Sequence, residues 1–498
     1  MNGKGRGAIR GGKKLPIVHR AYRGPWEQFD ARAYPKGAWV LHMIRRRLGD
    51  EAWWRAVNHY VKKHQHQCVE TDQFRRAVEE STGRSFERFF HDWTGRPGNP
   101  VVRVDHKWHA KDKLMEVRVR QTQKEDAWHF PLTLEYRAKS SSVLARFTRD
   151  IAEKDLRFFV PLGARPALVR VDPDQAVLME LTEGKGRDLW KAQLLEDPYV
   201  IARMRAAQHF GNSRRPEDRK LLAEALGREP SWGVVGAIAA ALGKTGGAVA
   251  RDALLKGLKI DHPKARRPVV EALGKFRGDK KVLAALAEIV NKGAPSYNVE
   301  AAAIRTWARM RPDGALTTLK ALLSRESHND MIRQAVLSGM AEQGDVSVVG
   351  TLIEWTDGAK PRRTRTTAMR ALSRLIETGD MDAPTRKSVL ETVTACLDHR
   401  EHRSVKSSAA QTLRTLGVHA APAVEALQAL ADHDPNPRVQ RTAQETIDKI
   451  QSGAEPRIQL QRLREELTKL RTANSAMQRR LERLEGKSED NYKGSEGR

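Results

Sequence analysis

The chain contains 498 residues, of which 40% are apolar, and its formal net charge is +27. This length exceeds what one hydrophobic core supports, so we expect about three folded domains. No apolar run is long enough to cross a bilayer and no apolar segment follows the first Met, which favours a cytoplasmic protein. The two cysteines, Cys68 and Cys396, lie far apart in the sequence and exclude a disulfide framework or a cysteine-based zinc site.

The positive charge has two interpretations. It could serve an anionic partner such as nucleic acid or a membrane surface. No compact basic block with interleaved aromatic residues occurs, so we expect the charge to be spread over exposed helix faces, with nucleic-acid binding as the weaker alternative. Residues 1–24 are rich in Gly, Lys and Arg, contain no acid and are predicted to be disordered. They could be a nucleic-acid arm or a translated remnant upstream of a damaged gene start.

Residues 25–99 have the apolar periodicity of helices. The first predicted stripe consists of Gly37, Val40, Leu41, Ile44 and Leu48, the second of Trp54, Val57 and Val61, and the third of Phe86, Phe89, Phe90 and Trp93. Thr71 is a suitable N-cap, and Gly83 can end the helix that follows it in a left-handed conformation. The segment Pro97-Gly98-Asn99-Pro100 then stops helix formation.

Over residues 100–185 the period changes to two. Val117 and Val119 alternate with Arg118 and Arg120, and similar alternation recurs after residue 130 and after residue 155. Short alternating runs separated by turn residues predict a small β-sandwich.

Residues 186–452 are helical and repetitive, with a unit of roughly 30 to 40 residues. Ala-rich segments recur, among them 237–243, 269–274, 299–302 and 405–410, and several end in Leu-Gly. Small residues let neighbouring helices approach closely, and Gly permits a sharp turn between them. These segments resemble HEAT repeats, and the predicted α-solenoid would offer a long surface to protein or peptide partners.

Residues 453–486 carry a heptad pattern that predicts a coiled coil. Its seam consists of Leu460, Leu463, Leu467, Leu470, Asn474, Met477, Leu481 and Leu484. Asn474 occupies an a position, where it can pair with its twin across a parallel dimer. We therefore expect a homodimer; a single amphipathic helix docked on the array is the alternative. Residues 487–498 are polar and predicted to be disordered.

A resemblance to a known family is carried by three segments in a fixed order. They are Tyr34-Pro35-Lys36-Gly37-Ala38, Phe89-Phe90-His91-Asp92-Trp93 and Pro97-Gly98-Asn99-Pro100. Their order and spacing resemble the second half of the catalytic domain in the aminopeptidase N family of zinc metallopeptidases. The resemblance extends over about residues 15–181. It implies a mainly α, multidomain protein: a helical remnant of a thermolysin-like catalytic domain, a small β-sandwich, a HEAT-like α-solenoid and a C-terminal coiled coil.

Members of this family remove N-terminal residues from peptides. They bind zinc through His-Glu-x-x-His and a further Glu, and they hold the substrate amine through Gly-x-Met-Glu-Asn. Neither motif occurs in this sequence, so we expect no cofactor in the chain as written. Tyr34 matches the family tyrosine whose hydroxyl donates to the oxyanion formed during peptide hydrolysis. Alternatively, Tyr34 is an aromatic anchor before a helix, which we favour in the absence of zinc.

Three functions therefore remain open. The first is an aminopeptidase N-like protein, truncated before the zinc motif and inactive as written, with a HEAT-repeat interaction array. The second is a functional zinc aminopeptidase whose N-terminal half is missing from this gene model. The third is a dimeric HEAT scaffold with no enzymatic role.

Three other clusters contain possible metal ligands. They are His64-Gln65-His66-Gln67-Cys68, Asp105-His106-Lys107-Trp108-His109 and His399-Arg400-Glu401-His402. None has a third ligand at a familiar spacing or a Glu placed to activate water. We expect ordinary solvated histidines at all three places and predict no metal ligands.

Overall fold

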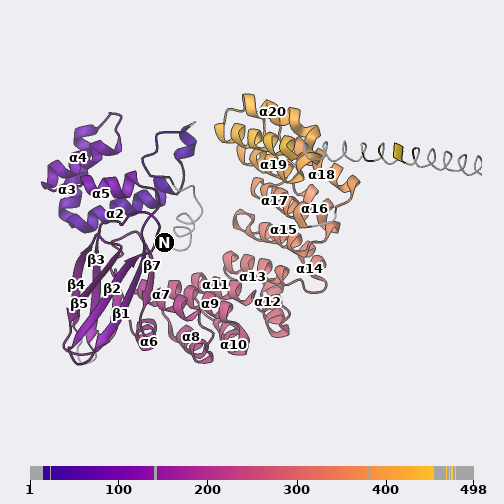
Figure 1. The fold of residues 1–498 in the computed structure, drawn as a ribbon. Helices are drawn as coiled ribbons and strands as arrows, with labels where there is room; N and C mark the ends of the chain where they lie inside the picture. The colour runs from indigo at the N-terminus through magenta and orange to yellow at the C-terminus, as the bar shows by residue number, and fades with distance from the viewer. Residues whose placement is uncertain are drawn as a thin grey trace, which may run out of the picture. The chain divides into compact units, whose positions relative to one another are not determined.

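The computed structural model describes residues 15–22, 24–138, 143–378 and 381–453, together with Leu467, Leu470, Ala473, Asn474 and Met477. The chain divides into two compact units, Met1–Ala272 and Leu273–Arg498. The first unit contains a block of helices, a β-sandwich and the beginning of the helical array, and the second contains the later array helices (Figure 1). The mainly α, multidomain fold predicted from the sequence is confirmed.

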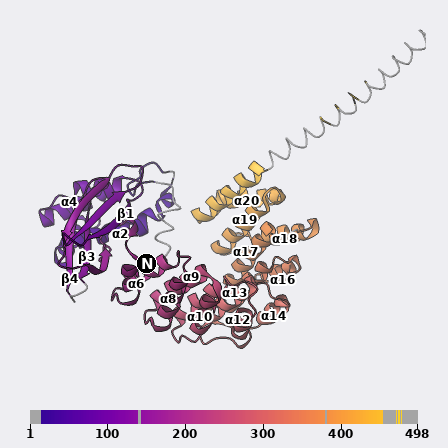
Figure 2. The ribbon, with the colours of Figure 1, turned by 60° about the horizontal axis from the view of Figure 1, so that its bottom comes forward.

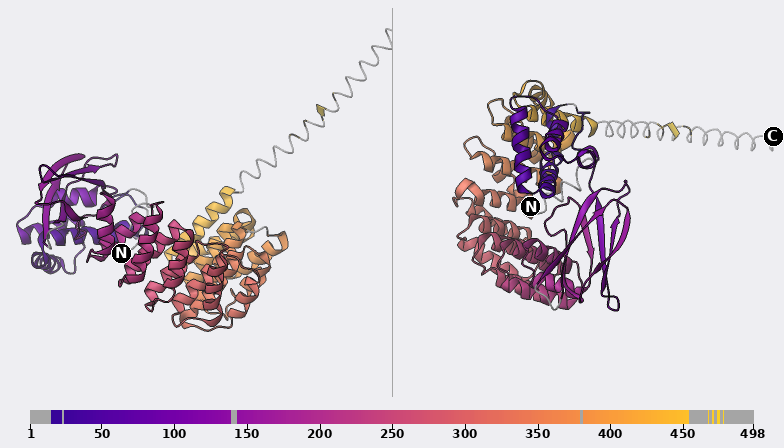
Figure 3. Two further views of the ribbon diagram at one scale, coloured as in Figure 1. Left: turned by 90° about the horizontal axis from the view of Figure 1, so that it is seen from below. Right: turned by 90° about the vertical axis from the view of Figure 1, so that its left-hand side faces the viewer.

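The helical block lies at one end of the β-strands (Figure 1, Figure 3). Its elements are η1 (Pro25–Gln28), η2 (Arg32–Lys36), α2 (Gly37–Leu48), α3 (Asp50–His64), α4 (Thr71–Thr82), α5 (Glu87–Phe90) and η3 (His91–Gly95). Helix α4 begins one residue earlier than predicted, because Glu70 and not Thr71 is its N-cap and forms a capping box with Gln73. Gly83 ends α4 in the left-handed conformation, as predicted.

Two of the predicted apolar stripes are partly wrong. Helix α2 buries Val40, Met43 and Ile44, whereas Leu41 is exposed. Helix α3 buries Trp53 instead of Trp54, because the Trp53 ring packs edge-on against Phe74 of α4. Val61 is likewise exposed. Packing against neighbouring helices therefore sets the inward face of each helix: α2 keeps the predicted Val40 and Ile44 but buries Met43 instead of Leu41, and the buried face of α3 is shifted by one residue.

The strands form two sheets with the orders β5-β2-β1-β7 and β4-β3-β6. Their bounds are β1 (Val101–His109), β2 (Leu114–Gln121), β3 (Phe130–Ala138), β4 (Leu144–Ile151), β5 (Asp155–Pro161), β6 (Pro166–Val171) and β7 (Glu180–Gly184). All neighbouring pairs are antiparallel except β1 and β7. Val117 and Val119 are buried while Arg118 and Arg120 are partly exposed, which confirms the predicted alternation.

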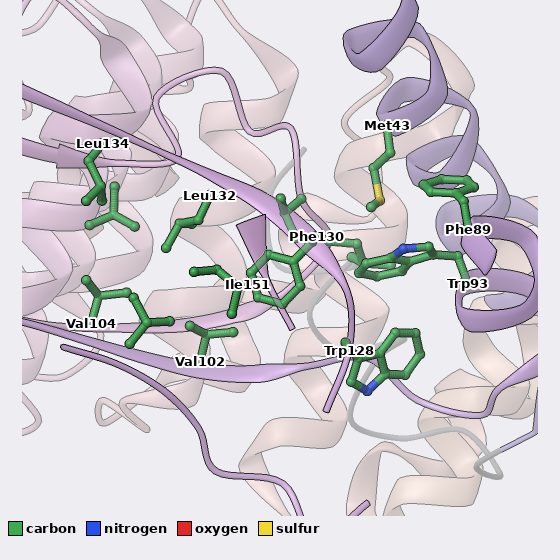
Figure 4. Close-up of a cluster of buried hydrophobic side chains, with 14 of the residues drawn as sticks. Met43, Phe89, Trp93, Val102, Val104, Trp128, Phe130, Leu132, Leu134 and Ile151 are labelled. Atoms are coloured by element: carbon green, nitrogen blue, oxygen red, sulfur yellow. The ribbon is translucent and has the colours of Figure 1, made fainter. Parts of the chain in front are cut away.

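One continuous core joins the helical block to the sandwich. It reaches from Met43 and Phe89, through Trp93 and Trp128, to the inward side chains of both sheets (Figure 4). The rings of Trp93 and Trp128 have centroids 4.8 Å apart, and both side chains are buried. The two parts therefore fold around a shared hydrophobic interior.

Charged groups reinforce this junction. The Nζ atom of Lys36 donates to the carbonyl oxygens of Arg96 (3.2 Å) and Gly98 (2.8 Å), which ties the start of α2 to the loop before β1. Asp92 is fully buried and accepts from Arg88 and Arg96, each at 3.1 Å. Burial opposes ionisation of Asp92, but the two guanidinium groups outweigh it and lower its pKa.

The first unit also contains the start of the array. Its helices are α6 (Arg187–Leu195), α7 (Val200–Phe210), α8 (Pro216–Arg228), α9 (Trp232–Thr245), α10 (Gly247–Gly257) and α11 (Pro263–Leu273). Helix α7 packs on α9. A Cβ atom at Gly211 would lie 2.8 Å from the Cβ of Ala241, so this close approach requires glycine.

The second unit continues the helical pattern. Its helices are α12 (Lys280–Lys292), α13 (Tyr297–Arg309), α14 (Ala315–Leu322), η4 (His328–Asp330), α15 (Met331–Gln343), η5 (Val346–Val348), α16 (Val349–Glu354), α17 (Arg362–Thr378), α18 (Ala383–Ala395), α19 (Arg403–Leu416), η6 (Gly417–Ala423) and α20 (Val424–His433). Helices α13, α15, α17 and α19 pack on one another in succession, and α14, α16 and α18 form a second row (Figure 2). Two rows of stacked helices are the arrangement expected of HEAT-like repeats. Within the described residues, no helix combines the length and apolarity needed to span a membrane.

The Lys36 clamp leads to a pH-dependent prediction. Burial, followed by repulsion from Arg96, lowers the pKa of Lys36 from 10.5 to about 8. The unfolded chain therefore binds more protons at this group between pH 8 and pH 10.5, and stability rises with pH across that window. We expect the free energy of unfolding of the wild type, relative to Lys36→Met, to rise by up to about 3 kcal/mol from pH 8 to pH 10.5.

Urea denaturation of both proteins at several pH values measures this difference. The matched control is Lys62→Met, because the Lys62 side chain is exposed on α3 and holds no such clamp. A wild-type advantage over Lys36→Met that stays constant from pH 8 to pH 10.5 would contradict the assignment.

Candidate functional site

The segment that leads to Tyr34 is fixed by hydrogen bonds. The backbone N–H of Val18 donates to the Thr94 carbonyl (3.0 Å), and the Gln28 side chain donates to the His19 carbonyl (2.9 Å). Arg32 pairs with Asp30 at 2.6 Å. The Arg32 guanidinium also donates to the carbonyl oxygens of residues 16 and 27. The approach to Tyr34 is therefore ordered by contacts with the segment itself and with the end of the helical block.

Tyr34 lies in the short π-helix η2, immediately before Pro35. Pro35 has no backbone N–H, and the next N–H, that of Lys36, donates to the Ala31 carbonyl five residues earlier (3.0 Å). The Tyr34 ring lies 5.8 Å from that of Phe29, and its side chain is 59% exposed. The wide turn thus directs the Tyr34 side chain to solvent while Lys36 points into the junction.

The exposed side of this turn continues along α2. Tyr34, Ala38 and Leu41 are spaced at i, i+4 and i+7, so they share one side, and all three are exposed. This stripe lies away from the buried face formed by Val40 and Ile44. The Tyr34 side chain is therefore accessible to a ligand or to another protein region.

The buried charges beside this turn are residues that sequence reasoning missed. Lys36 and Asp92 both belong to the family-like segments, and the sequence pattern does not predict their burial. The available signal was weak: Asp92 interrupts an otherwise aromatic stripe. The acceptors of Lys36 lie in the loop before β1, whereas Arg88 and Arg96 lie one turn away from Asp92 on either side, so neither group is free to act on a substrate.

The predicted absence of metal ligands concerns three clusters, whose side chains do not converge. His64 packs against Tyr60 at the end of α3, while His66 lies in a turn with a positive φ of 62° and is exposed. Cys68 is free and exposed. These positions place the three possible ligands in separate surroundings.

The possible ligands of the Asp105 cluster contact different partners along β1. Asp105 pairs with Arg103 and Arg120, whereas His109 contacts Glu116 at 2.7 Å. Both ring nitrogens of His106 are buried, and this desolvation lowers its pKa to about 4.

The side chains of Glu401 and His402 in the His399 cluster form contacts within the helical array. Glu401 forms a bidentate pair with Arg365, and His402 is the N-cap of α19, accepting from the Ser404 N–H at 3.1 Å. Among the described residues, no group of three His, Cys, Asp or Glu side chains could hold a metal ion. The residues described here therefore do not fit the zinc site that the family resemblance implies.

The predicted heptad seam is described only in part. Leu467, Leu470, Asn474 and Met477 are helical and exposed. Leu460, Leu463, Leu481 and Leu484 lie outside the described residues. Dimerisation through this seam stays a prediction.

Comparisons with known proteins match two regions of the chain. Residues 8–93 match the family model described as Peptidase family M1 domain, and residues 188–267 match the HEAT repeats model. Aminopeptidase M1-A of Oryza sativa subsp. japonica is 33% identical over 113 residues, which is 22% of this chain and 12% of that protein. Mitochondrial aminopeptidase 2 of Saccharomyces cerevisiae is 30% identical over 139 residues, or 26% of this chain and 15% of that protein. The chain thus spans a small part of the curated relatives it matches.

A solved structure is similar over a longer stretch. The crystal structure of Legionella pneumophila aminopeptidase A in complex with aspartic acid has a TM-score of 0.60 and covers 88% of this chain and 59% of its own. The sequence identity is 12%, so this likeness concerns the fold alone. The resemblance to the aminopeptidase N family and the HEAT-like character of the array are therefore both confirmed, each over the part of the chain that its comparison covers.

Proposed function

We propose that this chain is an aminopeptidase N-like interaction protein, and that these 498 residues do not hydrolyse peptides by themselves. The main support for this proposal is that the charged side chains near Tyr34 are already bound to other groups of the protein. Asp30 is paired with Arg32, and Lys36 is bound to two backbone carbonyls. Both charged groups are therefore engaged in holding the turn, and no group of three possible metal ligands occurs among the described residues. The HEAT-like array supports the second half of the proposal, because stacked helix pairs expose long surfaces to protein or peptide partners.

A second candidate is favoured by the exposed stripe on η2 and α2. A working zinc aminopeptidase would result if a zinc-binding region, in a longer protein or on another chain, covered Tyr34, Ala38 and Leu41. Exposed tyrosine and leucine on one helix side are suited to such a contact. Genomic DNA upstream of Met1 separates the two candidates, because an in-frame His-Glu-x-x-His there would favour the second.

The proposal predicts the outcome of a peptidase assay. The purified 498-residue chain, with zinc added, is expected to show no chelator-sensitive hydrolysis of leucine p-nitroanilide, because no group of three possible metal ligands occurs among the described residues. Tyr34→Phe should then equal the wild type. The matched control is Tyr22→Phe, which removes the hydroxyl of another exposed tyrosine. Zinc-dependent turnover that Tyr34→Phe lowers by about 100-fold and Tyr22→Phe leaves intact would overturn the proposal in favour of the second candidate.

We further propose that the chain forms a parallel homodimer through the C-terminal heptads. The support is the exposure of Leu467 (51%), Leu470 (69%) and Met477 (65%), which are spaced along one helix side together with Asn474. An isolated helix with such a side gains from burying it against a second copy. Asn474 at an a position would fix the parallel register at a cost in affinity.

Light scattering of the full chain over a range of concentrations tests this assembly. We expect a dimer that Leu470→Glu dissociates, since a charge would enter the seam. Asn474→Leu should tighten association by removing the buried amide. Ser475→Glu is the matched control, because the heptad places Ser475 outside the seam. A monomer at all accessible concentrations would contradict the dimer.

A further inference from the structure

A cavity of about 470 Å³ lies at the junction between the helical block and the sandwich. The floor of the cavity is apolar and is formed by Met43, Phe89, Trp93 and Phe130 (Figure 4). Its rim is cationic. Four arginines line it: Arg46, Arg47, Arg84 and Arg146. An apolar floor of this volume with a few convergent polar groups is typical of sites for small organic ligands.

Two of the rim arginines are already neutralised. Arg46 and Arg146 both reach Asp174, at 2.8 and 3.0 Å, and Arg146 also pairs with the buried Glu135. Their positive charges are therefore balanced by carboxylates of the sandwich.

The other two lack a carboxylate partner within the described chain. Arg47 stands 5.5 Å over the ring of Phe89, and Arg84 donates to the Arg47 carbonyl at 3.4 Å. Partial burial lowers the pKa of Arg47, and Asp150 at the same rim opposes this shift without forming an ion pair with it in the described structure. Two guanidinium groups thus remain at the mouth of an apolar cavity, where an anion would be attracted to both.

The floor offers an independent sign of a ligand. The Trp93 side chain has no exposed surface, and its Nε1–H has no acceptor in the described structure. Figure 4 shows this edge of the ring turned towards Met43 and Phe89, which also line the cavity. A buried donor normally finds an acceptor, and a ligand atom in the cavity would supply one.

We propose that this cavity binds a small organic carboxylate with a flat apolar group. The carboxylate lies at the mouth between Arg47 and Arg84, whose planar forks match its two oxygens. The apolar group lies on the floor beside Phe89 and Phe130, close to the Trp93 donor. Asp150 and Asp174 at the rim disfavour a ligand with two negative charges. Tyr34 does not line the cavity, so the site is independent of the proposed peptidase-related function.

Calorimetric titration of the full chain with 3-phenylpropionate tests the site. We expect saturable one-to-one binding, and we expect the uncharged 3-phenylpropanamide to bind about tenfold more weakly, because it lacks the charge that both guanidinium groups attract. No saturable binding of the carboxylate at millimolar concentration would overturn the proposal. Inorganic phosphate binding as tightly as 3-phenylpropionate would also overturn it, because the apolar group would then be irrelevant.

Variants locate the site. Arg47→Gln and Arg84→Gln should each weaken carboxylate binding about tenfold and leave the weak amide binding unchanged, which shows that the cavity is still folded. The matched control is Arg55→Gln on α3, where Arg55 pairs with the exposed Glu51. Trp93→Phe should weaken both ligands by removing the indole donor while keeping an aromatic ring. Equal affinities of wild type, Arg47→Gln and Arg55→Gln for the carboxylate would refute the site.

Discussion

The packing of Trp93 against Trp128 is the contact on which the first unit depends. Trp93 belongs to the helical block, and Trp128 immediately precedes the sheet that contains β3, so this one contact joins two kinds of secondary structure. The Arg96 guanidinium lies 4.4 Å over the Trp128 ring and donates to the carbonyl oxygens of Asp126 and Ala127. Apolar burial supplies the attraction, and the guanidinium adds two hydrogen bonds to the backbone just before Trp128.

This contact gives the family-like segment Phe89–Trp93 a structural role at the junction. Asp92 can be buried beside the two tryptophans because Arg88 and Arg96 hold it ionised; an unpaired carboxylate there would cost several kcal/mol. The residues that match the aminopeptidase family most clearly at this point therefore build the junction. Similarity at these positions is evidence for the fold. An argument for activity depends instead on Tyr34 and on whether a zinc-binding region contacts it.

The sequence predicted the parts of this structure that depend on local periodicity. The change of period near residue 100 correctly separated helices from strands, and Gly83 correctly ended α4. The inward face of α3 differs from the predicted face by one residue, and that of α2 contains Met43 instead of Leu41, because packing against neighbouring helices selects among overlapping apolar stripes. The bonds of Lys36 could not be predicted, since its acceptors lie 60 and 62 residues away and are backbone atoms that any sequence would offer. The cavity was missed for the same reason: arginines from distant segments form its rim.

The turn at η2 places two nearby side chains, Tyr34 and Lys36, in opposite environments. The interval between Tyr34 and Lys36 is two residues, yet one side chain faces solvent and the other is 9% exposed. The i to i−5 bond around Pro35 widens the turn and separates their directions. Because Lys36 is clamped to the loop before β1, the position of Tyr34 is set by the core of the sandwich junction. A tyrosine held in this way loses little further conformational freedom when it meets an oxyanion or a protein surface. The same geometry is therefore suited to a catalytic group and to a binding anchor, and what covers Tyr34 decides between them.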